Sequence, residues 1–556
     1  MNQFTILIGG TNGYGINDAC IILCRLFSRL GYHIYSCNDF PSVIKGQHQY
    51  AVVRAASQKI SARTRKPDWA LILDQETLDL HHKDFSENTI IIYDTEKVAI
   101  EPVPKNAIGL PLSKIVKDGR GATEMRPTCL VAALCQQMGI KWKVLEEVIK
   151  KHHPNKAGIE MELMQLVYGQ AAEQISPKQT SPKQTVAEKG NEALTDLSIP
   201  DQSGLPVMNG CQAISLGLLQ TGLRAYVAYP MTPTSPILEY LAGLEKEAGL
   251  QVVLPESEIA VIMTALGYSY MGVRNAIGTS GGGFSLMVEG LGLSGMSELP
   301  VVAIMGQRTG PSTGMPTYTA QTDLLFVLHA GHGEFCRFVV APGDAEEAFY
   351  WSGIAMNKAW KFRMPAIVLI DRTLGLGLYS FDIDLSPVLT EEKADGEQNP
   401  TKLKTGRAIK ANSYLHDDFG YARENPELAT ASTDNLLQKL NLLAKDLEKH
   451  EQVKVYGKGK TALLCWGSTK GVCIEIAEKF GLKVIQVLVV SPFPKKAIAK
   501  ALQNVERIIA VECNAQGQLA ILLKQNGFEV HDKILKYDGR PFALEDLEDE
   551  VEKVMK

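Results

Sequence analysis

Apolar runs alternate with amphipathic stretches through most of the chain. The amino-terminal region opens with the apolar run FTILIGG, a glycine loop TNGYG, the amphipathic stretch INDACIILCRLFSRLG and a second apolar run YHIYSC. This order predicts strand, helix and strand, as in a βαβ unit. Later apolar runs at PDWALIL and TIIIYD predict further strands, and KWKVLEEVIKKH predicts a helix. We therefore expect residues 1–175 to form an open, Rossmann-like α/β domain.

The pattern changes several times after this region, and the changes predict the domain organisation. Residues 176–203 contain a direct repeat of SPKQT and no apolar period, so this segment is predicted to be a linker. Residues 204–381 return to alternating strands and helices and predict a second α/β domain. Residues 382–459 are mostly polar and irregular and predict a connecting segment. Residues 460–556, with the apolar runs KTALLCWG, KVIQVLVV and ERIIAVEC, predict a third α/β domain with parallel strands.

Composition and charge narrow the possible classes of function. The 556 residues carry a formal net charge of -5, so no basic surplus favours binding to nucleic acid or to an anionic membrane surface. No apolar run approaches membrane-spanning length, the amino terminus lacks the basic start of a signal peptide, and a cytoplasmic location is expected. The ten cysteines lie mostly in apolar runs without a CxxC pair, which predicts buried, reduced thiols. Any iron–sulfur cluster that the protein uses must therefore be held by another chain.

The amino-terminal glycine loop invites comparison with a dinucleotide-binding turn. Gly10, Gly13 and Gly15 follow a predicted strand, and a helix that starts after such a loop can bind a phosphate group. Their spacing, G-x-x-G-x-G, reverses the dinucleotide-binding order G-x-G-x-x-G. We therefore favour a tight turn that packs the helix on the sheet over a nicotinamide-dependent dehydrogenase.

A proline-rich loop follows a predicted strand in the second domain. The segment AYPMTPTSP, residues 228–236, places three prolines and several hydroxyl groups at the carboxyl end of that strand. Open α/β sheets bind their ligands at this edge. A plain strand-to-helix turn with Thr234 or Ser235 as N-cap is the structural alternative, and both interpretations can hold together.

The same loop carries a resemblance to a known family. YPMTPTSP resembles the YPITPSS motif in the pyrimidine-binding domain of the 2-oxoacid:ferredoxin oxidoreductases. The similarity extends through PESEIAVIMTALGYSYMGVRNAIGTSGGG, GQRTGPSTGMPTYTAQTDL, ECNAQGQLA and KYDGRPF, and so covers both later domains. The first domain resembles the family's gamma subunit, with the linker at the point of a gamma-to-alpha fusion. The resemblance implies a pyrimidine-type thiamine-diphosphate-binding domain at 204–381 and a transketolase C-terminal-like domain at 460–556.

The resemblance also implies roles for individual residues. A thiamine enzyme needs a carboxylate at the aminopyrimidine ring nitrogen, and Glu258 matches the family's glutamate. Glu256 competes for this role, because spacing alone does not separate the two. Arg308 and Thr232 match the pair that binds the planar carboxylate of a 2-oxoacid. Gly282 stands where relatives carry proline, and ECNAQGQLA is expected to be structural. The predicted catalytic residues are Glu258, Arg308 and Thr232, and the predicted cofactor-binding residues are Tyr229, Pro230, Thr232, Glu258, Thr279, Ser280 and Gly281.

One expected motif is missing from the chain. No GDG motif followed by paired asparagines is present to hold Mg²⁺ and a diphosphate, and no metal ligand is predicted here. The resemblance therefore implies a beta subunit that carries the diphosphate, Mg²⁺ and an iron–sulfur cluster. It also implies CoA as co-substrate and ferredoxin as electron acceptor.

The predicted activity is the oxidative decarboxylation of 2-oxoglutarate, or a related 2-oxoacid, with CoA to acyl-CoA and CO₂. Pyruvate or a branched-chain 2-oxoacid is the alternative substrate, and a noncatalytic assembly subunit is the alternative role. A second substrate carboxylate would need another basic or hydroxyl group. The sequence does not rank the candidates for this contact, which are Lys45, His48, Arg274 and Thr313.

Overall fold

The computed structural model describes residues 3–43, 45–152, 157–173, 204–382, 389–392, 412–417 and 420–556. The chain divides into two compact units. Unit 1 consists of Met1–Met208, Gly377–Asp382 and Ala543–Glu545, and unit 2 of Asn209–Leu376, Ile383–Phe542 and Asp546–Lys556. The predicted linker at 176–203 lies outside the described residues. None of the helices in the described ranges combines the length and the apolar composition needed to cross a membrane.

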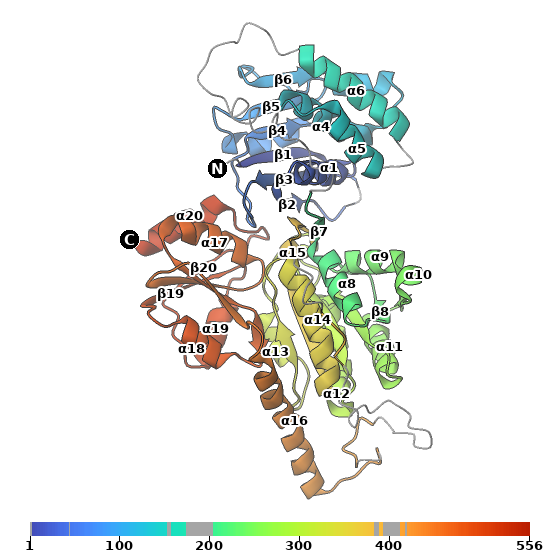
Figure 1. Ribbon diagram of the computed structural model, residues 1–556, viewed down its shortest axis with the longest axis vertical. Helices are drawn as coiled ribbons and strands as arrows, with labels where there is room; N and C mark the ends of the chain where they lie inside the picture. The colour runs from blue at the N-terminus through green and yellow to red at the C-terminus, as the bar shows by residue number, and fades with distance from the viewer. Residues whose placement is uncertain are drawn as a thin grey trace. The chain divides into compact units, whose positions relative to one another are not determined.

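Unit 1 is built on a mixed sheet. Its described strands are β1 (Gln3–Thr11), β2 (His33–Asp39), β3 (His48–Ala56), β4 (Trp69–Ile72), β5 (Ile90–Asp94), β6 (Ala107–Leu110), β7 (Val207–Asn209) and β14 (Leu378–Ser380). They run in the order β6-β5-β4-β1-β3-β2-β14-β7 (Figure 1). β1 pairs in parallel with β4, and β3 is antiparallel to both β1 and β2. β1 and β2 therefore run in the same direction, as in the predicted βαβ unit, but β3 lies between them.

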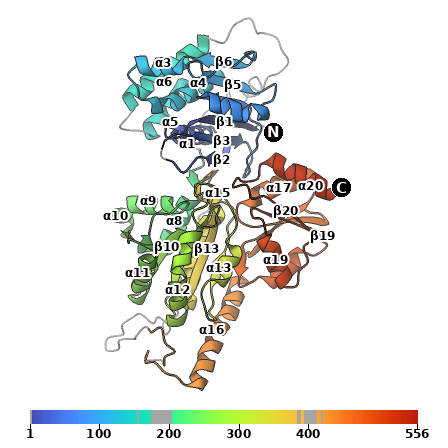
Figure 2. The same ribbon diagram turned by 180° about the vertical axis from the view of Figure 1, so that it is seen from behind.

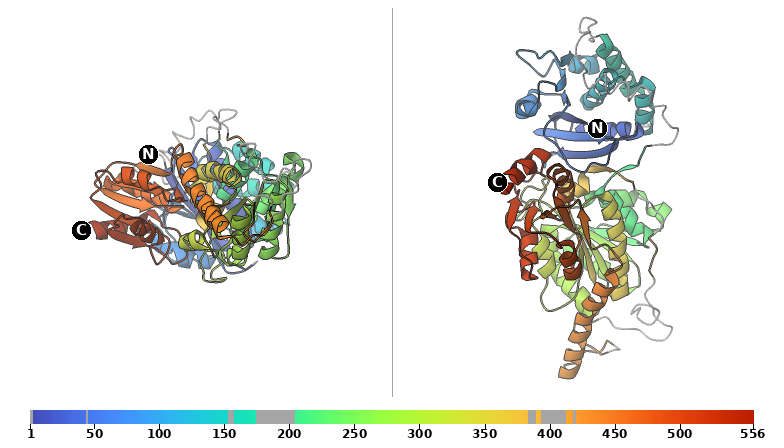
Figure 3. Two further views of the ribbon diagram at one scale, coloured as in Figure 1. Left: turned by 90° about the horizontal axis from the view of Figure 1, so that it is seen from below. Right: turned by 60° about the vertical axis from the view of Figure 1, so that its left-hand side comes forward.

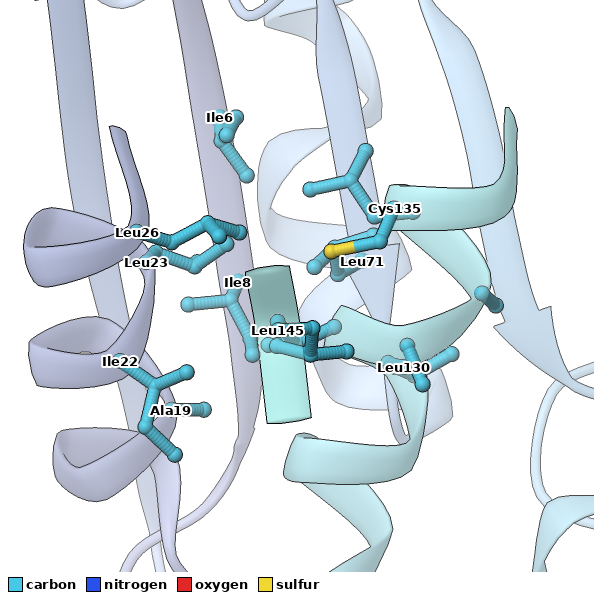
Figure 4. Close-up of a cluster of buried hydrophobic side chains, with 14 of the residues drawn as sticks. Ile6, Ile8, Ala19, Ile22, Leu23, Leu26, Leu71, Leu130, Cys135 and Leu145 are labelled. Atoms are coloured by element: carbon cyan, nitrogen blue, oxygen red, sulfur yellow. The ribbon is translucent and has the colours of Figure 1, made fainter. Parts of the chain in front are cut away.

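Helices pack against this sheet and close the core of unit 1. Those described are α1 (Ile16–Arg29), α2 (Gln75–His81), α3 (Leu112–Asp118), α4 (Arg126–Gln137), α5 (Trp142–His152) and α6 (Ala157–Glu173). Figure 4 shows side chains from β1, α1, β4, α4 and α5 meeting in one apolar cluster. Leu23 and Leu26 of α1 are fully buried there, and each such side chain contributes about 1.5–3 kcal/mol.

The larger sheet of unit 2 is almost entirely parallel. Its described strands are β8 (Ala225–Ala228), β9 (Gln251–Val253), β10 (Asn275–Ser280), β11 (Val301–Gln307), β12 (Phe338–Val340), β13 (Pro365–Asp371) and β18 (Val489–Ser491). The order is β18-β12-β13-β11-β10-β8-β9, and only the β12–β18 pair is antiparallel. Continuous Val, Ile and Leu runs are typical of strands buried on both faces.

Helices cover both faces of this sheet. The described helices are α8 (Gly210–Gln220), α9 (Ser235–Gly243), α10 (Glu245–Ala248), α11 (Glu258–Tyr270), α12 (Gly281–Ser297), α13 (Leu324–His329), α14 (Ala345–Phe362) and α15 (Arg372–Leu376). α8 and α14 pack together on one face (Figure 1), and α11 and α12 pack together on the other (Figure 2).

The carboxyl-terminal part of unit 2 has its own sheet, with the described order β15-β17-β16-β19-β20. Its strands are β15 (Val453–Tyr456), β16 (Thr461–Cys465), β17 (Lys483–Val487), β19 (Arg507–Glu512) and β20 (Asp532–Leu535). Its helices are α16 (Pro426–Leu447), α17 (Thr469–Phe480), α18 (Lys495–Ala501), α19 (Gln518–Gln525) and α20 (Leu544–Met555). β16 is parallel to β17 and β19, as predicted.

Consecutive strands of the chain lie in the two different sheets of unit 2. β17 lies in the smaller sheet, and β18, which follows it directly, pairs with β12 of the larger one. The long helix α16 projects from unit 2 (Figure 3), and only Leu443 and Leu447 of its side chains are fully buried. All ten cysteines are buried and free, which confirms the predicted reduced thiols. Three helix-covered sheets confirm the predicted α/β fold class.

Candidate functional site

The predicted site residues gather at one edge of the larger sheet in unit 2. β8, β10 and β11 are parallel neighbours, so their carboxyl ends meet at the same edge. The proline-rich loop follows β8, Thr279 and Ser280 end β10, and Arg308 directly follows β11. Sequence reasoning placed these segments at strand ends separately, and the strand order brings them together.

Glu258 is the first residue of α11 and is only 6% exposed. Ser257 caps this helix by accepting a hydrogen bond from the Ala260 N–H group. A β-carbon at Gly283 would lie 2.7 Å from Glu258 Oε1 and closer still to Thr279 Oγ1. The Glu258 carboxylate therefore lies beside Thr279 at the start of α12, in space that only a glycine leaves open.

Glu256 has a different environment, because its side chain is exposed. The two acids that spacing alone could not separate are therefore distinguished by burial. Glu258 has no ion-pair or hydrogen-bond partner for its carboxylate among the residues that the structure describes. A buried acid without a partner is costly to a fold and is typical of a functional group.

Arg308 contacts the proline-rich loop. Its Nη1 donates a hydrogen bond to the carbonyl oxygen of Thr232 at 3.2 Å, so the contact with Thr232 runs through the backbone. Nε of Arg308 is buried and has no hydrogen-bond partner among the described residues. Burial lowers the pKa of Arg308 from its ordinary value, but a guanidinium stays charged at neutral pH. The guanidinium also has further N–H groups that can bind a planar anion.

The proline-rich loop lies directly on the sheet. A β-carbon at Gly306 of β11 would lie 2.8 Å from Pro233 Cδ and from Thr234 Cγ2. Thr234 is the N-cap of α9, but its hydroxyl donates to the carbonyl oxygen of Met231 instead of capping the helix. Tyr229, at 41% exposure, and Pro230 lie on the outer side of the loop. These two predicted cofactor-binding residues are open to solvent in this chain.

The start of α12 is built from small residues. Thr279 and Ser280 are fully buried, and Ser280 Oγ has no hydrogen-bond partner among the described residues. Ser280 is the N-cap of α12 but makes no side-chain cap bond. At Gly282, where proline was expected from the resemblance, a β-carbon would meet nothing within 4 Å. The glycine that replaces proline at position 282 therefore leaves space beside the start of α12.

Sequence reasoning missed one acidic residue at this edge. Asp323, the N-cap of α13, places both carboxylate oxygens near Gly281, at 3.2 and 3.4 Å from the position of a β-carbon there. Burial raises the pKa of Asp323 to about 6. An aspartate before an apolar run is an ordinary helix start, so the sequence held no signal for this position.

The candidates for a second substrate carboxylate belong to both units. Lys45 and His48 belong to unit 1. Arg274 lies at the amino end of β10, at the edge opposite the site, and bonds to Asn357 and to the carbonyl oxygen of Thr221. Thr313 is exposed in the segment after β11. The Arg274 guanidinium therefore stabilises the fold through these bonds.

The carboxyl-terminal motif ECNAQGQLA has a structural environment, as expected. The Glu512 carboxylate is fully buried and accepts hydrogen bonds from Trp466 Nε1, Asn514 Nδ2 and the Leu519 N–H group at 2.9–3.1 Å. Such a satisfied carboxylate is anchored and has little capacity left for chemistry.

Two family models match parts of the chain. The family described as "Pyruvate flavodoxin/ferredoxin oxidoreductase, thiamine diP-bdg" matches residues 216–431, which include the site. The family described as "Pyruvate ferredoxin/flavodoxin oxidoreductase" matches residues 5–168.

Relatives and a solved structure extend this similarity to the whole chain. A 2-oxoacid:ferredoxin oxidoreductase 1 alpha subunit from Sulfurisphaera tokodaii is 31% identical over 99% of this chain and 97% of its own length. The 2-oxoglutarate synthase subunit KorA from Methanocaldococcus jannaschii is 29% identical over 61% of this chain and 97% of its own length. The fold is similar to that of a 2-oxoglutarate:ferredoxin oxidoreductase from Magnetococcus marinus, with a TM-score of 0.85, 24% identity and complete coverage of both chains. On the strength of the near full-length match, this chain belongs to the alpha subunits of the 2-oxoacid:ferredoxin oxidoreductases.

Proposed function

We propose that this chain supplies the aminopyrimidine side of a thiamine-diphosphate site and binds the 2-oxoacid, with 2-oxoglutarate as its substrate. The observation that supports this most directly is Glu258, a buried carboxylate without a described partner, at the carboxyl ends of parallel strands. The unpartnered polar atoms of Ser280 and Arg308 fit a ligand at the same edge. Bound thiamine diphosphate supplies a carbon nucleophile and an electron sink for decarboxylation.

Glu258 acts on the cofactor's ring. With the cofactor bound, its carboxylate would hydrogen-bond the aminopyrimidine ring nitrogen and would hold or release a proton at that atom. Thr279 lies beside this carboxylate, and Gly283 leaves room for it. Tyr229 and Pro230, on the exposed side of the proline-rich loop, would contact the ring of a bound cofactor.

Arg308 binds the carboxylate of the 2-oxoacid. Its free Nε donor, together with the remaining N–H groups of the guanidinium, matches a planar carboxylate. Thr232 fixes the guanidinium through its carbonyl oxygen and adds its hydroxyl as a second donor. Orienting the substrate in this way lowers the entropic part of the barrier.

A beta subunit completes the site. It holds the diphosphate, Mg²⁺ and an iron–sulfur cluster, since this chain lacks the GDG motif and the cysteine spacing for these groups. Ile259 and Met263 of α11 and Leu286 of α12 are about half exposed close to Glu258. Exposed apolar side chains beside an incomplete site favour a protein partner there. CoA takes the acyl group, and ferredoxin takes the electrons.

A comparison of three 2-oxoacids as substrates tests this proposal. The chain is assembled with its beta subunit, and 2-oxoglutarate, pyruvate and a branched-chain 2-oxoacid are compared for CoA-dependent reduction of a one-electron dye. We expect 2-oxoglutarate to give the highest kcat/KM. A preference for pyruvate would correct the substrate, and activity with none would refute the proposal.

Variants test the roles of the residues in the same assay. Glu258→Gln is expected to lower kcat by roughly 10²–10⁴-fold, because it removes an acid–base group. Glu256→Gln, the exposed neighbour, is the matched control and should keep wild-type kcat. A fully active Glu258→Gln complex would favour the noncatalytic assembly role.

A further inference from the structure

Asp323 occupies a helix-capping position without capping its helix. An N-cap aspartate normally accepts a hydrogen bond from an N–H group of the first turn. Asp323 makes no such bond to α13. Its own N–H group donates to Gln307 Oε1 at 3.0 Å, and its carboxylate faces Gly281, the first residue of α12. The side chain is therefore directed at a different helix.

The start of α12 is flanked by two acids. The Asp323 oxygens lie near Gly281, and Glu258 Oε1 lies near Gly283, in the same turn. The first N–H groups of a helix have no intrahelical partner and carry partial positive charge. Ser280, the N-cap, leaves them without a side-chain cap. No N–H group of α12 donates a hydrogen bond to the Asp323 carboxylate among the described residues, so an ionised Asp323 acts on these groups through its charge alone.

The loop that carries Asp323 is held by the carboxyl-terminal part of unit 2. Gln321 exchanges two hydrogen bonds with the backbone of Cys513, at 2.8 and 2.9 Å, and donates a third to the carbonyl oxygen of Trp466 at 2.8 Å. The Gln518 side chain bonds to the backbone on either side of Asp323, at 2.7 and 3.1 Å. The ECNAQGQLA motif therefore fixes this loop in place.

We propose that Asp323 is a positioning residue, whose carboxylate faces the start of α12 from outside and so holds the Gly281–Gly283 turn against Glu258. This inference rests on the proposed role of Glu258 and extends it to a second acid. The carboxyl-terminal part of unit 2 acts through Asp323, because Cys513 and Gln518 bond to the loop that carries Asp323. An ionised Asp323 attracts the N–H groups of the turn, and a protonated one does not.

The charge on Asp323 gives this role a pH dependence. Burial raises the pKa of Asp323 to about 6, so the carboxylate is ionised above that pH and protonated below it. Glu258 is the other titratable group at this turn, and the charged Arg308 follows the Gln307 that Asp323 contacts. We expect turnover of the wild-type complex to fall as the pH drops through about 6.

The test uses Asp323→Asn and Asp323→Glu in the assembled complex, with the exposed Asp434→Asn of α16 as control. Asp323→Asn should lower kcat by about 10-fold, leave KM for the 2-oxoacid within about twofold, and flatten the pH profile near 6. Asp323→Glu, which keeps the charge, should restore the pH dependence. Titration with thiamine diphosphate, followed by near-ultraviolet circular dichroism, should show weaker binding in Asp323→Asn.

A purely structural role would give a different result. Because burial disfavours the charge, neutral Asn should not lower the melting temperature at pH 8. A lower melting temperature with unchanged kcat per folded complex overturns the inference, as does a wild-type pH profile in Asp323→Asn. This inference can fail while the proposed function stands. If Glu258→Gln is inactive and Asp323→Asn is fully active, only the role of Asp323 is rejected.

Discussion

Each unit of this protein has a glycine-rich turn between a strand and a helix, but the two turns serve different purposes. In unit 1, a β-carbon at Gly15 would clash with the carbonyl oxygen of Glu124, and the residue has a φ of 90°. In unit 2, a β-carbon at Gly283 would meet the side chains of Thr279 and Glu258. The first turn makes room for the backbone of its own domain, and the second makes room for the buried carboxylate of Glu258. Glycine content alone does not identify a binding loop.

The largest expected effect comes from filling the second turn. Gly283→Ala places a methyl group against Glu258 Oε1 and Thr279 Oγ1, and must displace one of them. We expect kcat of the assembled complex to fall by about 100-fold, since small misplacements of reacting groups carry losses of this order. The dye-reduction assay measures this.

Gly282→Ala is the matched control for that variant. Its β-carbon meets nothing within 4 Å, and alanine is favoured over glycine inside a helix by roughly 0.5–1 kcal/mol. The control should keep wild-type kcat and unfold at the same or a higher temperature. Equal losses of activity in both variants would show that the turn tolerates no substitution, and would remove Glu258 from the explanation.

The next effect is on stability in the first turn. Gly15→Ala combines a positive φ with a clash against the Glu124 carbonyl oxygen, so we expect it to destabilise unit 1 by about 2–3 kcal/mol. Gly31→Ala has a similar φ of 87° but open space around its β-carbon, and should lose only about 1 kcal/mol. Denaturant unfolding of the chain measures both. A loss of turnover per folded complex in Gly15→Ala would indicate that this turn also serves catalysis.

Much of the fold was accessible from the sequence. Apolar runs such as VVAIMG and PAIVLI predicted β11 and β13, because strands buried on both faces need continuous apolar residues. Parallel connectivity then placed the loops after β8, β10 and β11 at one edge, which is where Thr232 and Arg308 meet.

Other features depend on long-range packing that leaves no local pattern. β14 returns to unit 1 to pair with β2, from more than 300 residues away. β3 lies antiparallel between β1 and β2, and the apolar runs alone carried no direction. Burial, which distinguishes Glu258 from Glu256, and the turn of Asp323 towards α12 are likewise set by neighbours distant in sequence.

The smallest expected effect concerns the pH dependence of the two units. Burial, followed by the neighbouring His48, lowers the pKa of His81 in unit 1 to about 4, and the two Nε2 atoms lie 3.0 Å apart. Between pH 6.5 and 4 the unfolded chain binds a proton that the folded chain does not, so stability falls as the pH falls through this window. We expect unit 1 to lose about 1–2 kcal/mol from this histidine between pH 7 and pH 5.

His81→Gln should flatten that loss in denaturant titrations, whereas His82→Gln, at an exposed position, should leave it unchanged. Unit 1 would then respond to acid through its stability, and unit 2 through turnover that depends on Asp323. If the unfolding free energy changes equally with pH in both histidine variants, this difference between the units is contradicted.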